Sequence, residues 1–490
     1  MACDARDGRD GKSNALLKLV AGIVGLNFDE LKQRDRQRNI QRLVVTSVVA
    51  STILAAAGAL SAYALNERHI AESRTMAAAS MNATGQNFDP AAGLQYAIQA
   101  ADRAPTEEAR NALAAALRSQ DSLVILQHST KINKAAISPM GSSILTCGDD
   151  AKARIWDLHT GQVVHELTGH TRRIHTCEFS PDGSEVVTAG TDLEPLIWDV
   201  RTGTSIAKLR GHTAAVMSAR FSTNSAWLVT ASEDGTVRVW NAKNGEARAK
   251  FYIPDEGAQD AFFIANDSNI LGVSEKGPCT IWDLESGLKL KEFSGEMNWV
   301  QDAILSPKQT RFMISNKQYG PSFYSLPDAT EISRAQTMNT YGGAFSADDS
   351  RAVTGSNEGE VWVWDLEAGV HIKTLLHPEA VDTMAISPNQ ETIVTGSDDG
   401  LRVWRMPEPG GGTAEQIGSL RGHKGAARVI MFAPHDNTRL LTIGVEDNTV
   451  RIWDLAHFLK VSNDQGPVLS LDELRKQART RLPIRGSDHR

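Results

Sequence analysis

Residues 205–241, SIAKLRGHTAAVMSARFSTNSAWLVTASEDGTVRVWN, contain the pattern that decides the fold. The stretch divides into an outer strand (SIAKL), a Gly-His pair, an apolar strand (VMSARF), a polar turn, a second strand (WLVTASE), an Asp-Gly turn and a third strand ending at Trp240. Short apolar strands separated by polar turns predict a four-stranded antiparallel sheet. Sheets of this kind, set radially around an axis, form a propeller.

The unit recurs with a period near 42 residues. Tyr324 marks the end of one unit, and the intervals between successive markers are 42, 42, 42, 42, 40, 40 and 49 residues, the last lengthened by the insertion PEPGGGTAE. The other units end at tryptophans: Trp156, Trp198, Trp240, Trp282, Trp364, Trp404 and Trp453. A repeated unit that cannot bury its own faces stacks on its neighbours. The sequence therefore predicts a mainly β fold over residues 121–457.

The unit from Gly-His to Trp-Asp resembles the WD-repeat family over about 335 residues. This resemblance implies a β-propeller whose first outer strand, here residues 122–126, completes the last blade. Eight blades follow if every unit is used, and seven, the common number in the family, is the alternative.

The resemblance also implies one buried polar network in each well-preserved blade. The histidine after glycine would bond to the aspartate of the tight turn, which in turn would hold a strand hydroxyl and the tryptophan indole. The residues are His170, Asp192, Trp198, His212, Asp234, Trp240, His423, Asp447 and Trp453, all with structural roles. Four units, ending at Trp282, Tyr324, Trp364 and Trp404, lack Gly-His, and Lys276, Gln318 and Glu358 replace turn aspartates, so we expect these blades to be less rigid.

A charge-free run over residues 43–65 predicts a transmembrane helix. As a helix it rises about 34 Å, slightly more than the hydrocarbon core of a bilayer. Basic residues precede it (Lys32, Arg34, Arg36, Arg38 and Arg42), so the positive-inside rule places residues 1–42 in the cytoplasm and the propeller on the non-cytoplasmic side of an inner or plasma membrane. A signal peptide cleaved after Ala64 and a buried core helix are the alternatives. Small residues spaced by four, Ser47, Ser51, Ala55 and Ala59, suggest a homodimer through the span.

Two further segments complete the organisation. Residues 66–120 are Ala-rich and predict a helical hairpin as connector, and residues 458–490 form a tail with one short helix that we expect to dock on the propeller or to fray. The order of segments resembles bacterial receptor-like proteins that often carry an N-terminal TIR or caspase-like domain. Only 42 residues precede the span, too few for such an effector, so the chain would be truncated or would act with a separate effector protein.

Composition excludes several functions. The net charge of −8 with interspersed signs argues against nucleic-acid binding, and four scattered cysteines signal neither a metal site nor a disulfide framework. HELTGH, residues 165–170, has one residue too many for a zinc protease motif. We therefore predict a non-catalytic membrane-anchored scaffold or sensor without cofactor, whose propeller rims bind a protein or peptide. The alternatives are the recognition part of a truncated signalling effector and a propeller enzyme with a channel active site.

Overall fold

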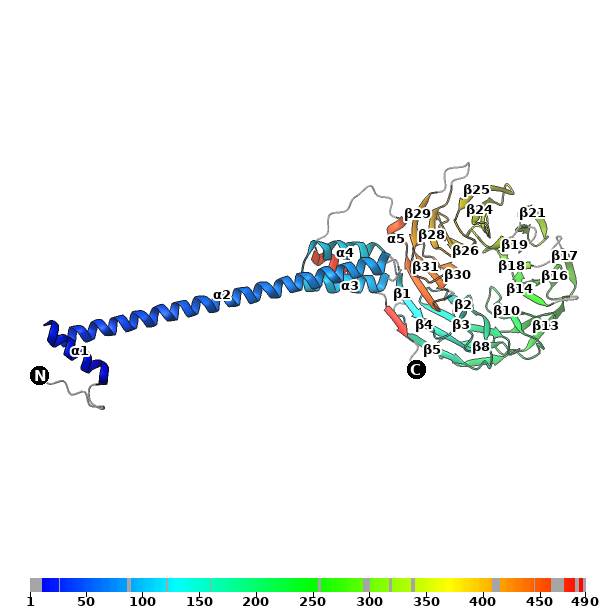
Figure 1. Cartoon of the computed structure of the whole chain (residues 1–490). Coiled ribbons are helices and arrows are strands. Elements are labelled where there is room, and N and C mark those ends of the chain that lie inside the picture. Colours follow the sequence, from blue (N-terminus) through cyan, green and yellow to red (C-terminus); the bar gives the residue numbers. More distant parts are fainter. Residues whose placement is uncertain are drawn as a thin grey trace.

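The computed structural model describes residues 11–25, 27–85, 90–119, 122–158, 160–253, 257–293, 300–316, 320–335, 340–407, 415–444, 446–459, 471–480 and 484–487. A long helical stalk leads into a ring of β-sheets (Figure 1). The helices are α1 (Gly11–Val24), α2 (Phe28–Gly85), α3 (Pro90–Arg103), α4 (Glu107–Ser119), α5 (Ala456–Leu459) and α6 (Leu471–Thr480).

The ring consists of eight sheets, which confirms the prediction of an eight-bladed propeller. We number blades 1–8 in chain order and write each from its inner strand outward. Blade 1 contains β2 (Ile132–Ile137), β3 (Ser143–Gly148), β4 (Lys152–Asp157) and β5 (Val163–Thr168), and blade 2 contains β6 (Ile174–Phe179), β7 (Glu185–Gly190), β8 (Leu196–Asp199) and β9 (Ser205–Lys208). Blade 3 contains β10 (Val216–Phe221), β11 (Trp227–Ser232), β12 (Thr236–Asn241) and β13 (Ala247–Tyr252), and blade 4 contains β14 (Ala258–Ile264), β15 (Asn269–Ser274), β16 (Cys279–Asp283) and β17 (Lys289–Phe293).

Blades 5–7 have the same order, and blade 8 is assembled from both ends of the propeller sequence. Blade 5 contains β18 (Val300–Leu305), β19 (Arg311–Asn316), β20 (Ser322–Ser325) and β21 (Thr330–Arg334), and blade 6 contains β22 (Thr340–Phe345), β23 (Arg351–Ser356), β24 (Glu360–Asp365) and β25 (Val370–Leu376). Blade 7 contains β26 (Val381–Ile386), β27 (Thr392–Ser397), β28 (Gly400–Arg405) and β29 (Gln416–Leu420). Blade 8 contains β30 (Ala427–Phe432), β31 (Arg439–Gly444), β32 (Thr449–Asp454), β1 (Ser122–Gln127) and β33 (Ile484–Ser487).

Blade 8 closes the ring. Strand β1 pairs antiparallel with β32, as the sequence predicts, with Leu126 opposite Val450. The tail then adds β33, which pairs parallel with β1 and places Val124 opposite Ile484. The predicted tail contained no strand, so this fifth strand is a feature that sequence analysis missed.

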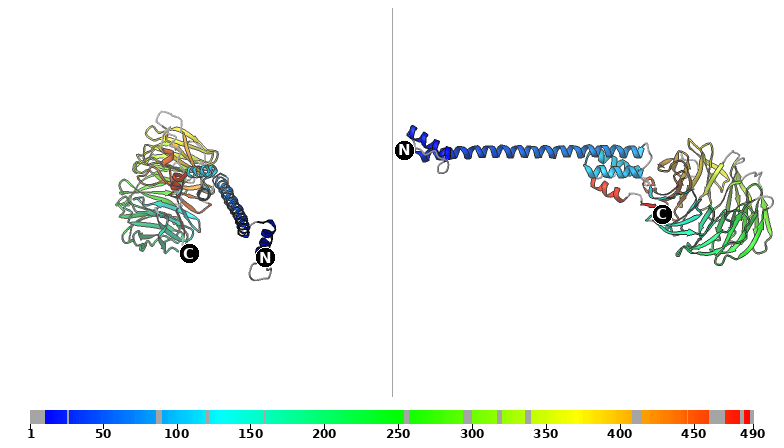
Figure 2. Two further views of the ribbon diagram at one scale, coloured as in Figure 1. Left: turned by 90° about the vertical axis from the view of Figure 1, so that its left-hand side faces the viewer. Right: turned by 60° about the horizontal axis from the view of Figure 1, so that its bottom comes forward.

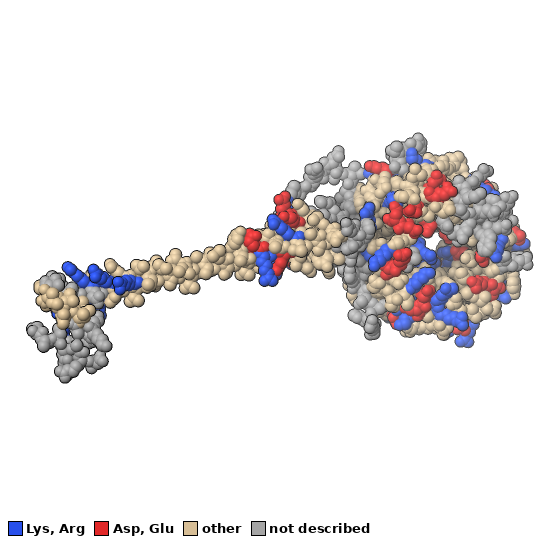
Figure 3. Space-filling model, in the orientation of Figure 1, with Lys and Arg blue, Asp and Glu red and all other residues tan. Residues whose placement is uncertain are grey.

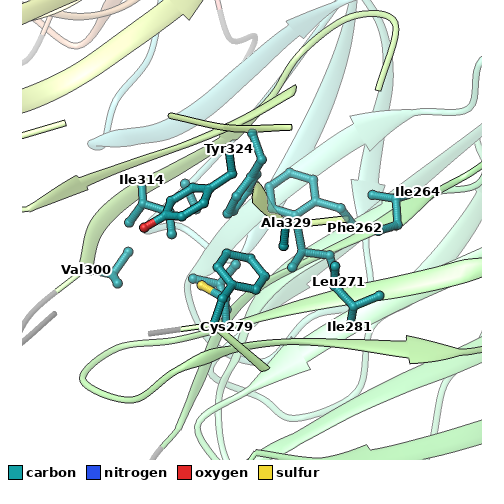
Figure 4. Close-up of a cluster of buried hydrophobic side chains, with 13 residues drawn as sticks. Phe262, Ile264, Leu271, Cys279, Ile281, Val300, Ile314, Tyr324 and Ala329 are labelled. Carbon is teal, nitrogen blue, oxygen red and sulfur yellow. The ribbon is translucent and has the colours of Figure 1, made fainter. Parts of the chain in front are cut away.

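The cores lie between successive blades. Because each blade is apolar on both faces, the aliphatic and aromatic side chains of one blade pack against those of the next. Figure 4 shows the core between blades 4 and 5, where Tyr324 occupies the position of the repeat-end tryptophan. Its ring lies 5.0 Å from that of Phe293, so the degenerate unit still fills its core with an aromatic ring.

The stalk is one continuous helix through and beyond the apolar run, and α3 and α4 pack against its C-terminal part. The core of this bundle is rich in alanine, which allows close approach of the helices. Helix α6 also belongs to it: Leu474 is buried in the bundle, and Arg479 pairs with Asp102 at 3.0 Å. The expectation that the tail helix docks on the propeller or frays is therefore wrong, because the bundle offers it an apolar groove and a carboxylate.

The cysteines also differ from expectation. Cys147 of β3 and Cys177 of β6 form a disulfide across blades 1 and 2, with a Cα–Cα distance of 6.3 Å. A spacing of 30 residues carries no disulfide signal in a linear sequence, but the repeat brings the two strands together. Cys279 is a buried free thiol, and burial raises its pKa to about 12. Cys3 lies outside the described residues.

Candidate functional site

The blade network is complete in blade 3. His212 Nδ1 lies 2.9 Å from Asp234 Oδ2, and its Nε2 lies 2.7 Å from the hydroxyl of Thr230. The indole N–H of Trp240 donates to that same hydroxyl at 2.9 Å. The tryptophan was expected on the aspartate, whereas the structure makes threonine the shared partner of imidazole and indole.

Blades 2 and 8 repeat this arrangement, with Thr188 and Thr442 in the position of Thr230. Their His–Asp contacts are 2.7 Å for His170 with Asp192 and 3.1 Å for His423 with Asp447 Oδ2. Their indoles donate to the same hydroxyls, Trp198 at 2.8 Å and Trp453 at 2.7 Å.

The protonation states of His212 and Asp234 follow from this geometry. Burial lowers the pKa of His212, although Asp234 partly opposes the shift. Burial alone would raise the pKa of Asp234, but hydrogen bonds from Thr236, the backbone of Thr213 and His212 hold it at about 2. A neutral imidazole beside an ionised carboxylate is a structural arrangement, as the family resemblance implies.

Blade 7 carries a network that sequence analysis missed. It lacks the glycine, but His377 is buried and its Nε2 lies 2.8 Å from the hydroxyl of Thr395, which also accepts the Trp404 indole N–H at 2.8 Å. Arg402 approaches His377 Nδ1 and pairs with Asp399. The signal for this blade was the histidine itself, preceded by leucine rather than glycine.

Blade 1 has the histidine without the complete network. His128 is buried beside Trp156, with ring centroids 5.1 Å apart, but its Nε2 finds no hydrogen-bond partner among the described residues. The turn residue Asp150 pairs with Arg154 at 2.7 Å instead. Only the donation from the Trp156 indole to Thr146, at 2.8 Å, remains of the usual arrangement.

Blades 4–6 have lost the histidine. In blade 4, Gly272 stands where threonine is expected, and a Cβ there would lie 2.6 Å from the Trp282 ring. In blade 6, Trp364 keeps its donation to Thr354 at 2.9 Å. Lys276 and Glu358 lie in the β15–β16 and β23–β24 turns, and Gln318 lies outside the described residues. These blades depend on packing more than on polar contacts.

A charged cluster lines the channel where the inner strands of blades 1–5 face each other. Arg220 binds Asp260 with two hydrogen bonds, Nε to Oδ1 at 3.1 Å and a terminal nitrogen to Oδ2 at 2.8 Å. It also lies 3.6 Å from Glu178 and stacks over Phe262. Lys134 donates to Thr176 at 3.0 Å. The hydroxyl of Ser218 donates to Asp260, so this carboxylate is held on two sides.

Asp302 is the exception in this cluster. Its carboxylate accepts the backbone N–H of Ala303 at 3.0 Å, and the described residues give it no ion-pair partner. It is open to the channel, yet protein surrounds it and limits its hydration. This burial, together with repulsion from Asp260, raises its pKa to about 6. Asp302, Glu178, Arg220 and Phe262 border a cavity of about 520 Å³ at the end of strands β10, β14 and β18.

The geometry of the described residues gives little support to a metal site or to histidine-based catalysis. No group of three potential metal ligands comes together among the residues that the structure describes. The residues lining the cavity include no histidine. In the HELTGH stretch, His165 contacts the backbone carbonyl of Arg201, whereas His170 belongs to the network of blade 2.

Helix α2 carries the apolar run on an exposed surface. The stretch Lys32–Asn82 is long and apolar enough to cross a membrane, and its most apolar window has no buried residue. Figure 3 shows a long part of this helix without charged side chains, with basic residues gathered at its N-terminal end. The four small residues of the stripe, Ser47, Ser51, Ala55 and Ala59, are all exposed.

Comparison with known proteins identifies the family of the propeller. Five segments, residues 120–157, 161–199, 203–241, 369–405 and 414–454, match the family described as "WD domain, G-beta repeat". The structure resembles that of the computationally designed Ika8 protein with a TM-score of 0.57 and 20% identity, over 68% of this chain and 99% of that one. The five repeat matches, together with the eight blades, show that the chain belongs to the WD-repeat propeller family.

Several relatives are named proteins. Human serine-threonine kinase receptor-associated protein is 26% identical over 25% of this chain and 33% of its own length. Small ribosomal subunit protein RACK1 of Caenorhabditis elegans is 25% identical over 24% and 37%, respectively. WD repeat and SOCS box-containing protein 1 of Xenopus tropicalis is 34% identical over 27% and 30%. The chain thus spans about a third of the length of these relatives.

Proposed function

We propose that this protein is a membrane-anchored, non-catalytic scaffold or sensor whose propeller binds a protein or peptide partner. The relatives support an interaction role, because one is named as receptor-associated and another as a protein of the small ribosomal subunit. The proposal has two parts, the anchor and the partner site.

The anchor is residues 43–65 within α2. These side chains are exposed, and an exposed apolar surface of this length is stable in lipid rather than in water. The five basic residues before it favour a cytoplasmic N-terminus and a propeller on the other side. The disulfide between Cys147 and Cys177 supports the same orientation, since such bonds persist in oxidising compartments.

The partner site is the cavity beside Asp302, and its charge balance is the observation that carries this part. The cluster contains three carboxylates (Glu178, Asp260 and Asp302) and two cations (Lys134 and Arg220), a balance of −1 when all are ionised. Arg220 contacts both Asp260 and Glu178, and Lys134 donates to Thr176, so Asp302 is the carboxylate of this cluster without an ion-pair partner among the described residues. A Lys or Arg side chain of a partner would supply the missing cation.

Binding to an array of basic, neutral and acidic peptides tests this site on the purified full-length chain in detergent. We expect selection of peptides with Lys or Arg, and about tenfold weaker binding after Asp302→Asn, because the partner's cation loses its charged partner. Glu285→Gln, at an exposed outer turn of blade 4, is the matched control and should bind as the wild type does. No preference for basic peptides, or equal binding by both variants, would refute the site.

A further inference from the structure

The disulfide between blades 1 and 2 is covalent, whereas the other contacts between these two blades are non-covalent. Strands are joined by hydrogen-bonded ladders only within a sheet, whereas the two blades meet through apolar side chains and side-chain hydrogen bonds such as that from Lys134 to Thr176. Cys147 and Cys177 belong to that apolar core, and their side chains are 1% and 0% exposed. The bond is therefore a covalent link across an otherwise non-covalent interface.

The position of the link is significant because blade 1 lies next to the ring closure and lacks the complete polar network. Its polar network is incomplete, with His128 Nε2 lacking a partner and Asp150 engaged by Arg154. It also follows directly after β1, the strand through which the helical bundle and α2 join the propeller. Strand β1 lies in blade 8 and the chain runs directly from it into β2, so blade 1 is the next blade to be loaded if a pull from the stalk detaches β1 from β32.

We infer that the Cys147–Cys177 bond is a structural lock that keeps blade 1 attached to blade 2 and so secures the ring to its stalk. Its formation removes two protons and two electrons from the two thiols, which pass to the disulfide of a thiol–disulfide oxidant and convert it to a dithiol. This inference rests on the proposed function in one respect only, the compartment of the propeller, because the oxidant must be present on the side of the membrane where the propeller lies.

Burial makes this bond a stable lock rather than a rapid switch. Thiolate attack needs access to a sulfur atom, and neither sulfur is accessible in the folded blade pair. We expect dithiothreitol to reduce the native protein at least about tenfold more slowly than the denatured protein.

The test uses the full-length chain, purified from membranes without reductant. Peptide mass analysis should find residues 147 and 177 in one disulfide-linked pair, and limited proteolysis should then be compared before and after reduction. We expect reduction, or the Cys147→Ser/Cys177→Ser double variant, to speed cleavage in the blade 1 loops about tenfold and to lower the Tm by about 5 °C. Cys279→Ala, at a buried free thiol in blade 4, is the matched control and should leave blade 1 cleavage unchanged.

Three results separate the lock from the proposed topology. Unchanged cleavage of blade 1 after complete reduction would overturn the lock even if the bond exists. Two free thiols after the purified chain has been partly unfolded in urea and returned to buffer with glutathione disulfide would overturn the bond itself. A chain that is reduced when isolated, but forms the bond and gains protection on oxidation, would keep the lock and contradict only the placement of the propeller in an oxidising compartment.

Discussion

At the scale of single residues, the threonine hydroxyl is the centre of each blade network. In blade 3 it is buried, lies within hydrogen-bond distance of His212 Nε2 and accepts the Trp240 indole N–H. We predict that Thr230→Val lowers the free energy of unfolding by about 2–4 kcal/mol, because two buried polar groups lose their partner. Urea denaturation followed by tryptophan fluorescence measures this change.

Thr213→Val is the matched control for that experiment. Thr213 is exposed and contacts Asp234 through its backbone N–H, which the substitution keeps. Its effect should stay within about 0.5 kcal/mol. Equal effects of the two substitutions would contradict the central role of the hydroxyl.

The buried histidines make stability depend on pH. His128 and His377 have pKa values lowered to about 4, by burial first and then by the nearby arginines. Between pH 6.5 and 4 the unfolded chain takes up these protons and the folded chain does not, so stability falls with falling pH. We predict a loss of up to about 1.4 kcal/mol per pH unit for each histidine, measured by urea denaturation at pH 7, 6 and 5.

His377→Gln tests the assignment of that pH dependence. The variant should be less stable than the wild type at pH 7 and should lose less stability on going to pH 5, because one titrating group is gone. An unchanged slope would show that other groups cause the acid sensitivity.

The sequence predicts these networks only where the whole motif is present. Gly-His and Asp are visible in blades 2, 3 and 8, so their histidines, aspartates and tryptophans could be named from the repeat. His377 was missed because leucine precedes it, and the Cys147–Cys177 pair because neighbouring blades bring together residues 30 positions apart. Asp302 has no motif at all, since its environment depends on the ring that surrounds it.

At the scale of elements, α2 joins the apolar run to the bundle as one helix, so the proposed dimer stripe can be tested by substitution. Ala55→Ile should weaken association in lipid by about 1 kcal/mol, since a bulky side chain prevents close approach of two helices. Ala57→Ile, about 200° away around the helix, is the matched control. Energy transfer between labelled copies in vesicles measures association, and identical results for both variants would exclude this stripe as the contact.

Helix α6 offers a second test at this scale. Leu474 is 7% exposed in the bundle core, and its truncation to alanine removes apolar contacts that hold the helix. We predict about 2–3 kcal/mol weaker docking, seen as at least tenfold faster hydrogen exchange over residues 471–480. Asp472→Ala, at an exposed position of the same helix, should change exchange little. Slow exchange in the Leu474 variant would show that other contacts hold α6.

The elements themselves differ in how well the sequence predicts them. The strands and the two helices of the connector follow from local periodicity and turn residues, whereas the closing role of β1 was implied by the resemblance to the WD-repeat family. The docking of α6 and the addition of β33 depend on tertiary partners that local patterns do not encode. A short amphipathic helix predicts an apolar partner but not which one.

At the scale of the whole molecule, the stalk reaches the ring from the side, next to blade 8, and two further views show α2 extending away from it as a single rod (Figure 2). Figure 1 views the ring so that its centre is visible, with the stalk running across the picture. The tail links the two parts, because α6 lies in the bundle and β33 in blade 8. The propeller would thus be presented to a partner with its channel mouths unobstructed by the stalk.

The central claim is that α2 spans a membrane with the propeller on the non-cytoplasmic side. Its most direct test is labelling of single cysteines by a membrane-impermeant maleimide in intact spheroplasts of a bacterial host. In a Cys3→Ser background, Glu246→Cys on the propeller surface should react and Leu16→Cys in α1 should react only after lysis, while carbonate leaves the chain in the membrane fraction. Reaction of Leu16→Cys but not Glu246→Cys before lysis, or release of the chain by carbonate, would contradict the account.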